Sequence, residues 1–212
     1  YPDLERGLYL FEHRRCDDEI ISFCNMLCCK VSLKPITGVA PTDLVAPSMG
    51  YLHIDGLSLS FGRSRANPTE ASTIADWLAS NRDDLKQQYG TKLEDIVGAV
   101  TPFGRQVQEL KSACADRGID VQKMTIGTVH SLQRAERQVV VFWPVYSKHA
   151  GGQFIDMSPS MLNVTVSRAK DSFFVFGDMD FFSSAAKGAP RSVLADVLFS
   201  SKGTALDFAT QP

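Results

Sequence analysis

Two positively charged side chains stand between a helix and a strand that the sequence predicts. Pro159 suits the first turn of a helix through the segment Met161–Asp171. The apolar run Phe173–Phe176 that follows has the length and composition of a buried strand. Arg168 and Lys170 lie at the junction, where an arginine held by both elements can stabilise the negative charge of a bound phosphate. Taken alone, the segment favours an arginine that caps the helix C-terminus or pairs with a surface acid.

The sequence LNVTVSRAK at positions 162–170 resembles the last conserved motif of superfamily 1 helicases. The resemblance is strongest to bacterial, AAA-type relatives of the nonsense-decay helicases. In that family the arginine of the motif is the arginine finger for ATP hydrolysis, and Arg168 stands in its place. The resemblance therefore implies that Arg168 is catalytic and binds the nucleotide.

A second stretch with the same resemblance lies near the start of the chain. The family pattern L-x-E-H-Y-R-C-H-P-x-I-I-x-F-C-N is matched by Leu10, Glu12, His13, Arg15, Cys16, Ile20, Ile21, Phe23, Cys24 and Asn25. Arg14 replaces the family's tyrosine, and Asp17 and Asp18 replace His-Pro. The family arginine matched by Arg15 is a second cation facing the terminal phosphate, so a catalytic and nucleotide-binding role is implied for Arg15. Read without the family, Arg15 is a local cap or bridge.

A third stretch extends the predicted nucleotide site. The family pattern G-T-V-x-x-L/F-Q-G-x-E-x-x-V-V is matched at Gly127, Thr128, Val129, Leu132, Gln133, Glu136, Val139 and Val140. The resemblance implies that Gln133 and Glu136 bind the nucleotide. Arg134 stands where the family has a glycine, which allows a tight backbone beside the nucleotide. An arginine there points to solvent or crowds the phosphate side.

Nucleic-acid contacts are predicted at the ends of neighbouring strands. The segment from Thr101 to Gln106 follows the family pattern T-P-F/Y-x-x-Q, which touches the nucleic-acid backbone in the family. The segment Ser64–Ala71 follows the pattern S-x-x-N-x-x-E-A, although local helix capping by Asn67 and Glu70 explains it as well. The predicted nucleic-acid-binding residues are Asn67, Thr101, Thr128, His130 and Ser131.

The alternation of apolar runs and helical patterns predicts an α/β fold with a mostly parallel sheet and helices on both faces. The expected strands are 7–11, 51–55, 57–61, 96–101, 124–128, 139–143 and 172–177, and the expected helices are 18–28, 68–89, 104–117, 159–167, 178–186 and 192–199. The resemblance specifies this fold as RecA-like, that is, similar to P-loop NTPases. Residues 1–200 are predicted to form one such domain with a small inserted hairpin at about 49–62, and residues 201–212 a loose tail.

The chain lacks the sequence G-x-x-x-x-G-K-[ST], the loop that cradles phosphates in P-loop proteins. The resemblance places that loop, and the ligands for Mg²⁺, in an upstream RecA-like domain of the same protein. It thus implies the second motor domain of an ATP-dependent helicase or translocase that acts on single-stranded DNA or RNA. The fragment alone is expected not to hydrolyse ATP.

Composition narrows the alternatives. The 212 residues carry a formal net charge of −2, and five cysteines without ligand spacing favour reduced thiols of a cytoplasmic protein over a metal site. No apolar run approaches the roughly 20 residues that span a bilayer, so no membrane partner is expected. A dinucleotide enzyme needs a G-x-G-x-x-G turn that is absent, and Cys16 beside His13 has no oxyanion loop to make a hydrolase. A non-catalytic nucleic-acid-binding module derived from a motor domain remains the alternative.

Overall fold

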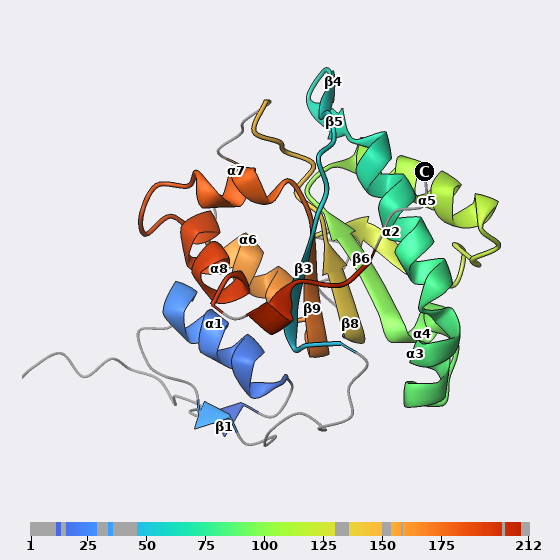
Figure 1. Cartoon of the computed structure of the whole chain (residues 1–212), viewed down its shortest axis with the longest axis horizontal. Coiled ribbons are helices and arrows are strands. Elements are labelled where there is room, and N and C mark those ends of the chain that lie inside the picture. Colours follow the sequence, from blue (N-terminus) through green and yellow to red (C-terminus); the bar gives the residue numbers. More distant parts are fainter. Residues whose placement is uncertain are drawn as a thin grey trace, which may run out of the picture.

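The computed structural model describes residues 12–13, 16–28, 34–35, 46–129, 136–149, 154–157, 159–200 and 202–208. Its centre is a five-stranded sheet in which every neighbouring pair is parallel (Figure 1). The strand order is β3 (Met49–His53), β9 (Ala169–Gly177), β8 (Arg137–Phe142), β6 (Val97–Thr101) and β7 (Thr125–Thr128). The predicted α/β fold is therefore confirmed.

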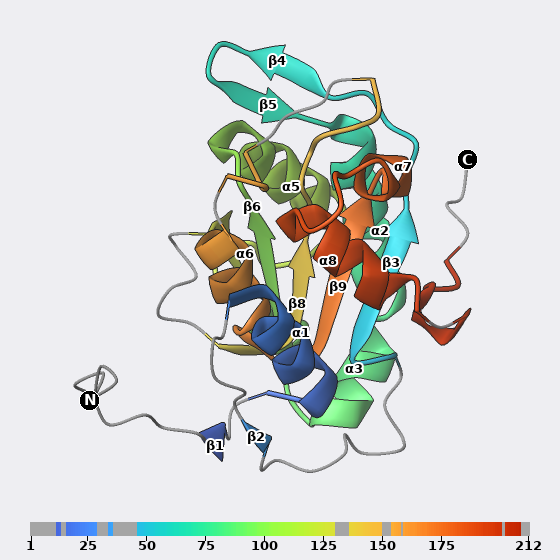
Figure 2. The ribbon, with the colours of Figure 1, turned by 90° about the vertical axis from the view of Figure 1, so that its left-hand side faces the viewer.

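Helices cover both faces of the sheet (Figures 1 and 2). One face carries α2 (Pro68–Ser80), α3 (Arg82–Tyr89), α4 (Leu93–Ile96) and α5 (Gly104–Asp116), and the other carries α1 (Asp18–Cys28), α6 (Pro159–Val166), α7 (Met179–Ser183) and α8 (Pro190–Leu198). Alternate residues of the central strands face opposite sides. Phe173 and Val175 of β9 pack with the second group of helices, whereas Phe174 and Phe176 pack with the first. Burial on both faces explains why these strands read as continuous apolar runs.

Helix boundaries follow the capping residues, with one correction. Asn67 caps α2 by accepting the backbone N–H of Glu70, and Pro68 occupies the first turn as expected. The single helix predicted over 68–89 is wrong, because it breaks at Asn81 into α2 and α3. The Asn81 side chain donates to the carbonyl of Trp77, so it competes for the bonding that would continue the helix.

The hairpin predicted at about 49–62 is also wrong in its pairing. The observed hairpin joins β4 (Leu59–Phe61) to β5 (Ser64–Ala66), and it projects beyond the sheet (Figure 2). β3 instead pairs with β9, more than 100 residues later in the chain. Leu52 and Tyr51 pack with opposite core layers, so β3 requires a place in the two-faced sheet that a surface hairpin cannot give it.

Three further segments bear on the predicted elements: the start of β9, the C-terminal tail and the first residues of the chain. β9 begins at Ala169, three residues before the predicted strand. The tail is not loose over 202–208, since the Leu206 N–H donates to the carbonyl of Tyr51 at 2.9 Å. The strand predicted at 7–11 lies outside the described residues. The short β1 (Glu12–His13) pairs in parallel with β2 (Lys34–Pro35).

Within the described part of the chain, no helix combines the length and apolar character needed to cross a membrane.

A buried hydrogen-bond clamp joins α5 to the start of α2. The Gln106 side chain accepts the Asn67 N–H at 2.7 Å and donates to the Asn67 carbonyl at 3.0 Å, and both residues are 0% exposed. Gln106→Ala leaves the Asn67 N–H without its partner, while the Asn67 carbonyl keeps the Ala71 N–H, so we expect the free energy of unfolding to fall by about 1–3 kcal/mol. Denaturant unfolding measures this. Gln108→Ala, on the exposed side of the same helix, should change it by less than about 0.5 kcal/mol, and equal effects of the two variants would refute the clamp.

Candidate functional site

Arg168 lies at the amino edge of the sheet, between the end of α6 and the start of β9. Its carbonyl accepts the N–H of Arg137 at 3.1 Å, and its own N–H donates to the carbonyl of Thr165 at 3.3 Å. The backbone is therefore fixed by the neighbouring strand and by the preceding helix. The side chain is half-buried, and its Nε is inaccessible to water yet has no hydrogen-bond partner among the described residues. Within that part of the chain no acidic side chain forms an ion pair with it.

The segment that begins α1 lies against the same junction. The Cys16 thiol donates to the carbonyl of Ser167 at 3.5 Å, and the Asp17 N–H donates to the carbonyl of Lys170 at 2.7 Å. Cys16 and Asp17, which lie far from Arg168 in sequence, thus contact residues on either side of it. Arg15 directly precedes Cys16 but lies outside the described residues, as do Gln133 and Arg134. Of the other predicted nucleotide ligands, Glu136 is half-buried and directly precedes Arg137, the residue that pairs with the end of α6.

The predicted nucleic-acid contacts fall at the opposite, carboxyl edge of the sheet. Thr101 and Thr128 end β6 and β7 and lie side by side in register. Thr101 is 0% exposed, and its hydroxyl accepts the Phe103 N–H at 3.4 Å, so this side chain is engaged within the domain. Thr128 is half-buried, whereas His130 and Ser131 lie outside the described residues.

Asn67 is brought to this edge but not to the surface. Its side chain caps α2, and its backbone is held by Gln106. A Cβ added at Gly56 would lie 2.7 Å from Asn67 Oδ1, which shows that the backbone of Gly56 closes over the amide. Asn67 and Gln106 therefore have structural roles here, and a contact between Asn67 and nucleic acid stays a prediction that requires this packing to open.

A carboxyl group is buried beneath the same edge. Glu70, in the first turn of α2, is 0% exposed, and neither of its side-chain oxygens has a hydrogen bond among the described residues. Burial raises the pKa of Glu70 well above its usual range, and the Asp178 carboxylate adds to the rise, while the Asn67 amide and the Val145 backbone oppose it. Val145 has a φ of 68°, a conformation that β-branched residues rarely adopt. Such strain gathers at functional sites.

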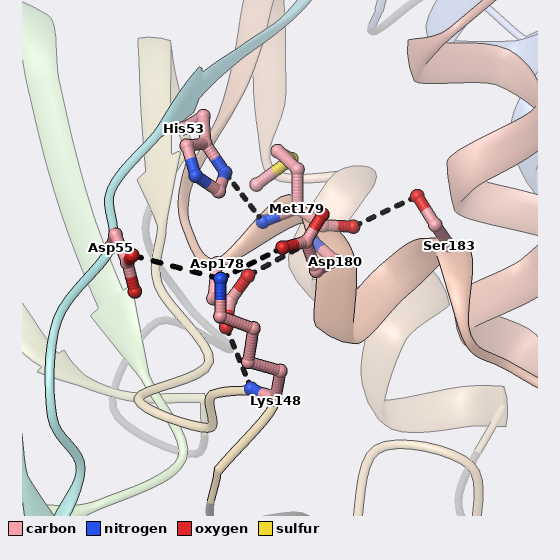
Figure 3. A network of polar contacts seen from close by, with 7 residues as sticks. All are labelled: His53, Asp55, Lys148, Asp178, Met179, Asp180 and Ser183. Atoms are coloured by element: carbon pink, nitrogen blue, oxygen red, sulfur yellow. Dashed lines mark hydrogen bonds and ion pairs between the residues drawn. The ribbon is translucent and has the colours of Figure 1, made fainter.

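A polar network secures the end of the sheet where β3 and β9 finish (Figure 3). Asp178 is buried and caps α7 by accepting the Asp180 N–H, and its other oxygen accepts the Lys148 N–H at 2.6 Å. The Lys148 ammonium lies 3.0 Å from Asp180 and 3.6 Å from Asp55. His53 Nδ1 accepts the Met179 N–H at 3.1 Å. Because two carboxylates already surround Lys148, its charge is locally neutralised.

A cluster of aromatic rings and an arginine lies beyond the carboxyl ends of β6 and β8. The sequence analysis did not predict this cluster. Phe103, just after β6, packs edge-to-face on Tyr146, just beyond β8, with ring centroids 5.3 Å apart. Arg65 of the β4–β5 hairpin stands over the Tyr146 ring at 5.2 Å. The chain passes outward from β6 to β7 and returns to β8, so this is the switch point at which open α/β sheets bind ligands. The sequence from Leu57 to Arg65, in which serines or glycine alternate with apolar residues and arginines, was the signal that could have located the hairpin.

The parallel sheet with helices on both faces is consistent with a RecA-like fold. The fold is shared with the C-terminal domain of a possible DNA helicase from Lactobacillus plantarum WCFS1. The TM-score is 0.51 and the identity 13%, and the match covers 88% of this chain and 95% of that one. A family model described as an AAA domain matches residues 11–180, and the chain belongs to that family.

The buried Glu70 carboxyl makes the free energy of unfolding depend on pH. Its pKa is 4.5 when unfolded and higher when folded, so the folded state holds the proton longer as pH rises. Stability should therefore fall as pH increases above about 4.5, until the folded carboxyl ionises. Glu70→Gln removes this titration, so the melting temperature of the variant relative to wild type should rise from pH 5 to pH 8. Thermal melts across this range test it, with the exposed Asp84→Asn as control. A difference between Glu70→Gln and wild type that does not vary with pH would contradict the prediction.

Proposed function

We propose that this chain is the second motor domain of an ATP-dependent superfamily 1 helicase or translocase. In this role Arg168 and Arg15 face the terminal phosphate of an ATP held by an upstream RecA-like domain of the same protein. Gln133 and Glu136 complete the nucleotide site, and the carboxyl edge of the sheet forms part of the track for single-stranded DNA or RNA. The cytoplasmic location expected from the cysteines stays a prediction.

The state of the Arg168 side chain is the observation that carries this proposal. The Nε atom has been removed from water and has no partner among the described residues. An unpaired buried donor costs about 1–3 kcal/mol, and more when it is charged. A phosphate oxygen supplied from outside the domain would satisfy it, and a guanidinium fork matches phosphate geometry. The fixed backbone on both sides of Arg168 would present that fork in one orientation.

The residues of this chain are suited to contact the terminal phosphate of ATP but not to coordinate its Mg²⁺. Arg168, with Arg15 expected nearby, supplies positive charge but no carboxylate ligands, and the chain has no phosphate loop. ATP bound between two domains supplies the free energy for their closure, with Mg²⁺ held by the upstream one. This chain's own part is to stabilise charge that develops during phosphoryl transfer, a task for which arginine fingers contribute about 10³–10⁵ in rate.

The alternative is a non-catalytic nucleic-acid-binding module, in which the arginines no longer serve hydrolysis. The two functions differ in whether ATP turnover in the full-length protein depends on Arg168. They share the nucleic-acid surface, so nucleic-acid binding alone does not distinguish them. The half-buried guanidinium without an acidic partner among the described residues favours the motor, because a binding module has no need to keep it.

The first prediction of the proposal concerns turnover. In the full-length protein, Arg168→Ala should lower kcat for ATP by about 10³-fold or more with a smaller change in nucleotide affinity, because the arginine acts in the transition state. Arg15→Ala should behave similarly, and the two losses should not add. Steady-state ATPase assays and nucleotide titrations measure both quantities.

Lys170→Ala is the matched control, since it removes an exposed positive charge two residues further along the chain, near the start of the strand that follows Arg168. It should leave turnover within about twofold of wild type. Arg168→Lys keeps the charge but loses the fork, so it should recover little of the rate. Wild-type turnover in Arg168→Ala, or equal losses in Lys170→Ala, would reject the arginine-finger role.

The second prediction concerns the track. We expect the full-length protein to bind a labelled single strand without base preference, and more weakly as salt rises. The double variant Thr128→Ala, His130→Ala should bind less tightly, because the phosphates are expected to pass the end of β7 and the residues that follow it. Titrations at several salt concentrations test this. Thr91→Ala, before α4 near the opposite edge of the sheet, is the control, and unchanged affinity in the double variant would remove these residues from the track.

A further inference from the structure

Exposed apolar side chains concentrate at one place on the domain. Among the described residues seven large hydrophobic side chains are exposed, and three of them, Leu57, Leu59 and Phe61, lie on or beside strand β4 of the hairpin. Two more, Phe154 and Met157, lie in the segment 154–157. Figure 2 shows the hairpin above the carboxyl ends of the strands, beyond α5. Exposed apolar side chains that gather on one hairpin are uncommon unless they meet a partner.

The same hairpin is positively charged in a chain that is acidic overall. Residues 57–66 contain Arg63 and Arg65 and no acidic residue, whereas the whole chain carries a net charge of −2. Arg63 is exposed, and no acidic side chain within the described ranges forms an ion pair with it. Arg105 of α5 joins them, with its backbone N–H donating to the Ser64 hydroxyl at 3.1 Å, while its guanidinium also pairs with Glu109 at 2.9 Å. The local charge is therefore complementary to a polyanion.

Arginine and aromatic groups are interleaved here. The Arg105 guanidinium stands 5.1 Å from the centre of the Phe61 ring, which is 46% exposed. Phe154 is 44% exposed and lies 6.3 Å from Phe103, ring to ring. Phe103 in turn packs on Tyr146 beneath Arg65. The exposed ring of Phe61 thus belongs to one set of contacts and that of Phe154 to another, and both sets include a residue of the hairpin.

We propose that Phe61 and Phe154, with Arg63, Arg65 and Arg105, form a base-stacking platform for single-stranded nucleic acid. Unpaired bases present flat faces that stack on exposed aromatic rings, while the arginines meet the phosphates between them. A duplex keeps its base faces covered and cannot use Phe61 in this way. The proposal deepens the proposed function, on which it rests, by assigning base contacts to the hairpin and leaving the sheet edge to the phosphates.

The test compares two probes of equal length on the full-length protein. One is a fluorescein-labelled oligothymidine of about 16 nucleotides, and the other is the same backbone without bases. Wild type should bind the oligothymidine at least about tenfold more tightly than the abasic strand, since stacking is lost with the bases. Phe61→Ala should remove most of this difference while keeping the abasic affinity. Phe61→Trp should restore it.

Charge and aromatic controls separate the two kinds of contact. Arg63→Gln should weaken both probes alike and lower the salt dependence by about one phosphate contact. Phe199→Ala removes another exposed ring, at the end of α8 against Tyr51, and should change neither probe. Because Phe61 is exposed, its truncation should leave the melting temperature unchanged, which excludes unfolding as the cause of a lost signal.

The outcomes distinguish this inference from the function on which it rests. If wild type binds neither probe and Arg168→Ala leaves turnover intact, the proposed function fails. If wild type binds both probes equally, or if Phe61→Ala keeps the preference for bases, the platform is refuted while the track along the sheet edge stands. A Phe61→Ala variant that binds both probes normally but loses a protein partner would identify the hairpin as a protein-docking surface and would likewise refute the platform.

Discussion

The insertion of β9 between β3 and β8 is the constraint on which both ends of the domain depend. β9 comes late in the chain, yet it occupies the interior of the sheet, with β3 on one side and β8 on the other. Its first residues bring the end of α6 against Arg137 and the start of α1. Its last residue, Gly177, passes so close to Glu70 that an added Cβ would lie 3.2 Å from Glu70 Oε1. One strand therefore fixes Arg168 at the amino edge and closes the buried carboxyl at the carboxyl edge.

Strand β9 separates the proposed contact with ATP from the proposed contacts with nucleic acid by its own length. Nine residues in β9 span about 30 Å at the usual rise per residue. The arginine proposed to face ATP lies at one end, and the threonines, aromatic rings and arginines proposed to meet nucleic acid lie near the other. Because a sheet packed on both faces deforms little, a movement imposed at one edge carries the other with it. A motor domain that closes on ATP could thus displace its track as a rigid body.

Local chemistry made much of the fold predictable, and non-local pairing made the rest unpredictable. Asn67, Pro68 and Pro159 marked helix starts correctly because capping involves only neighbouring residues. The apolar runs of β6, β8 and β9 indicated buried parallel strands for a similar reason. Alternation around Tyr51 could not reveal that its strand pairs with β9, more than 100 residues away. The same limit applies to the site: the motifs located Thr101 at the correct edge, but only the packing shows that its hydroxyl is engaged within the domain.

The unsatisfied groups at the two edges differ in what they imply. Glu70 can avoid the cost of a buried charge by keeping its proton, so the domain can tolerate it alone. Arg168 presents a buried donor instead, because its Nε has no partner among the described residues. Its buried Nε must therefore either bear the cost or find an acceptor. Arg137 Nε is also buried without a partner among the described residues, but the terminal nitrogens of Arg137 donate to the Glu136 carbonyl and the Thr125 hydroxyl. The Arg168 guanidinium has no such bonds within the described part of the chain, which supports the proposed phosphate partner. In the proposed function, the amino edge is half of a site that a phosphate from outside the domain completes, and the carboxyl edge is the surface that meets nucleic acid.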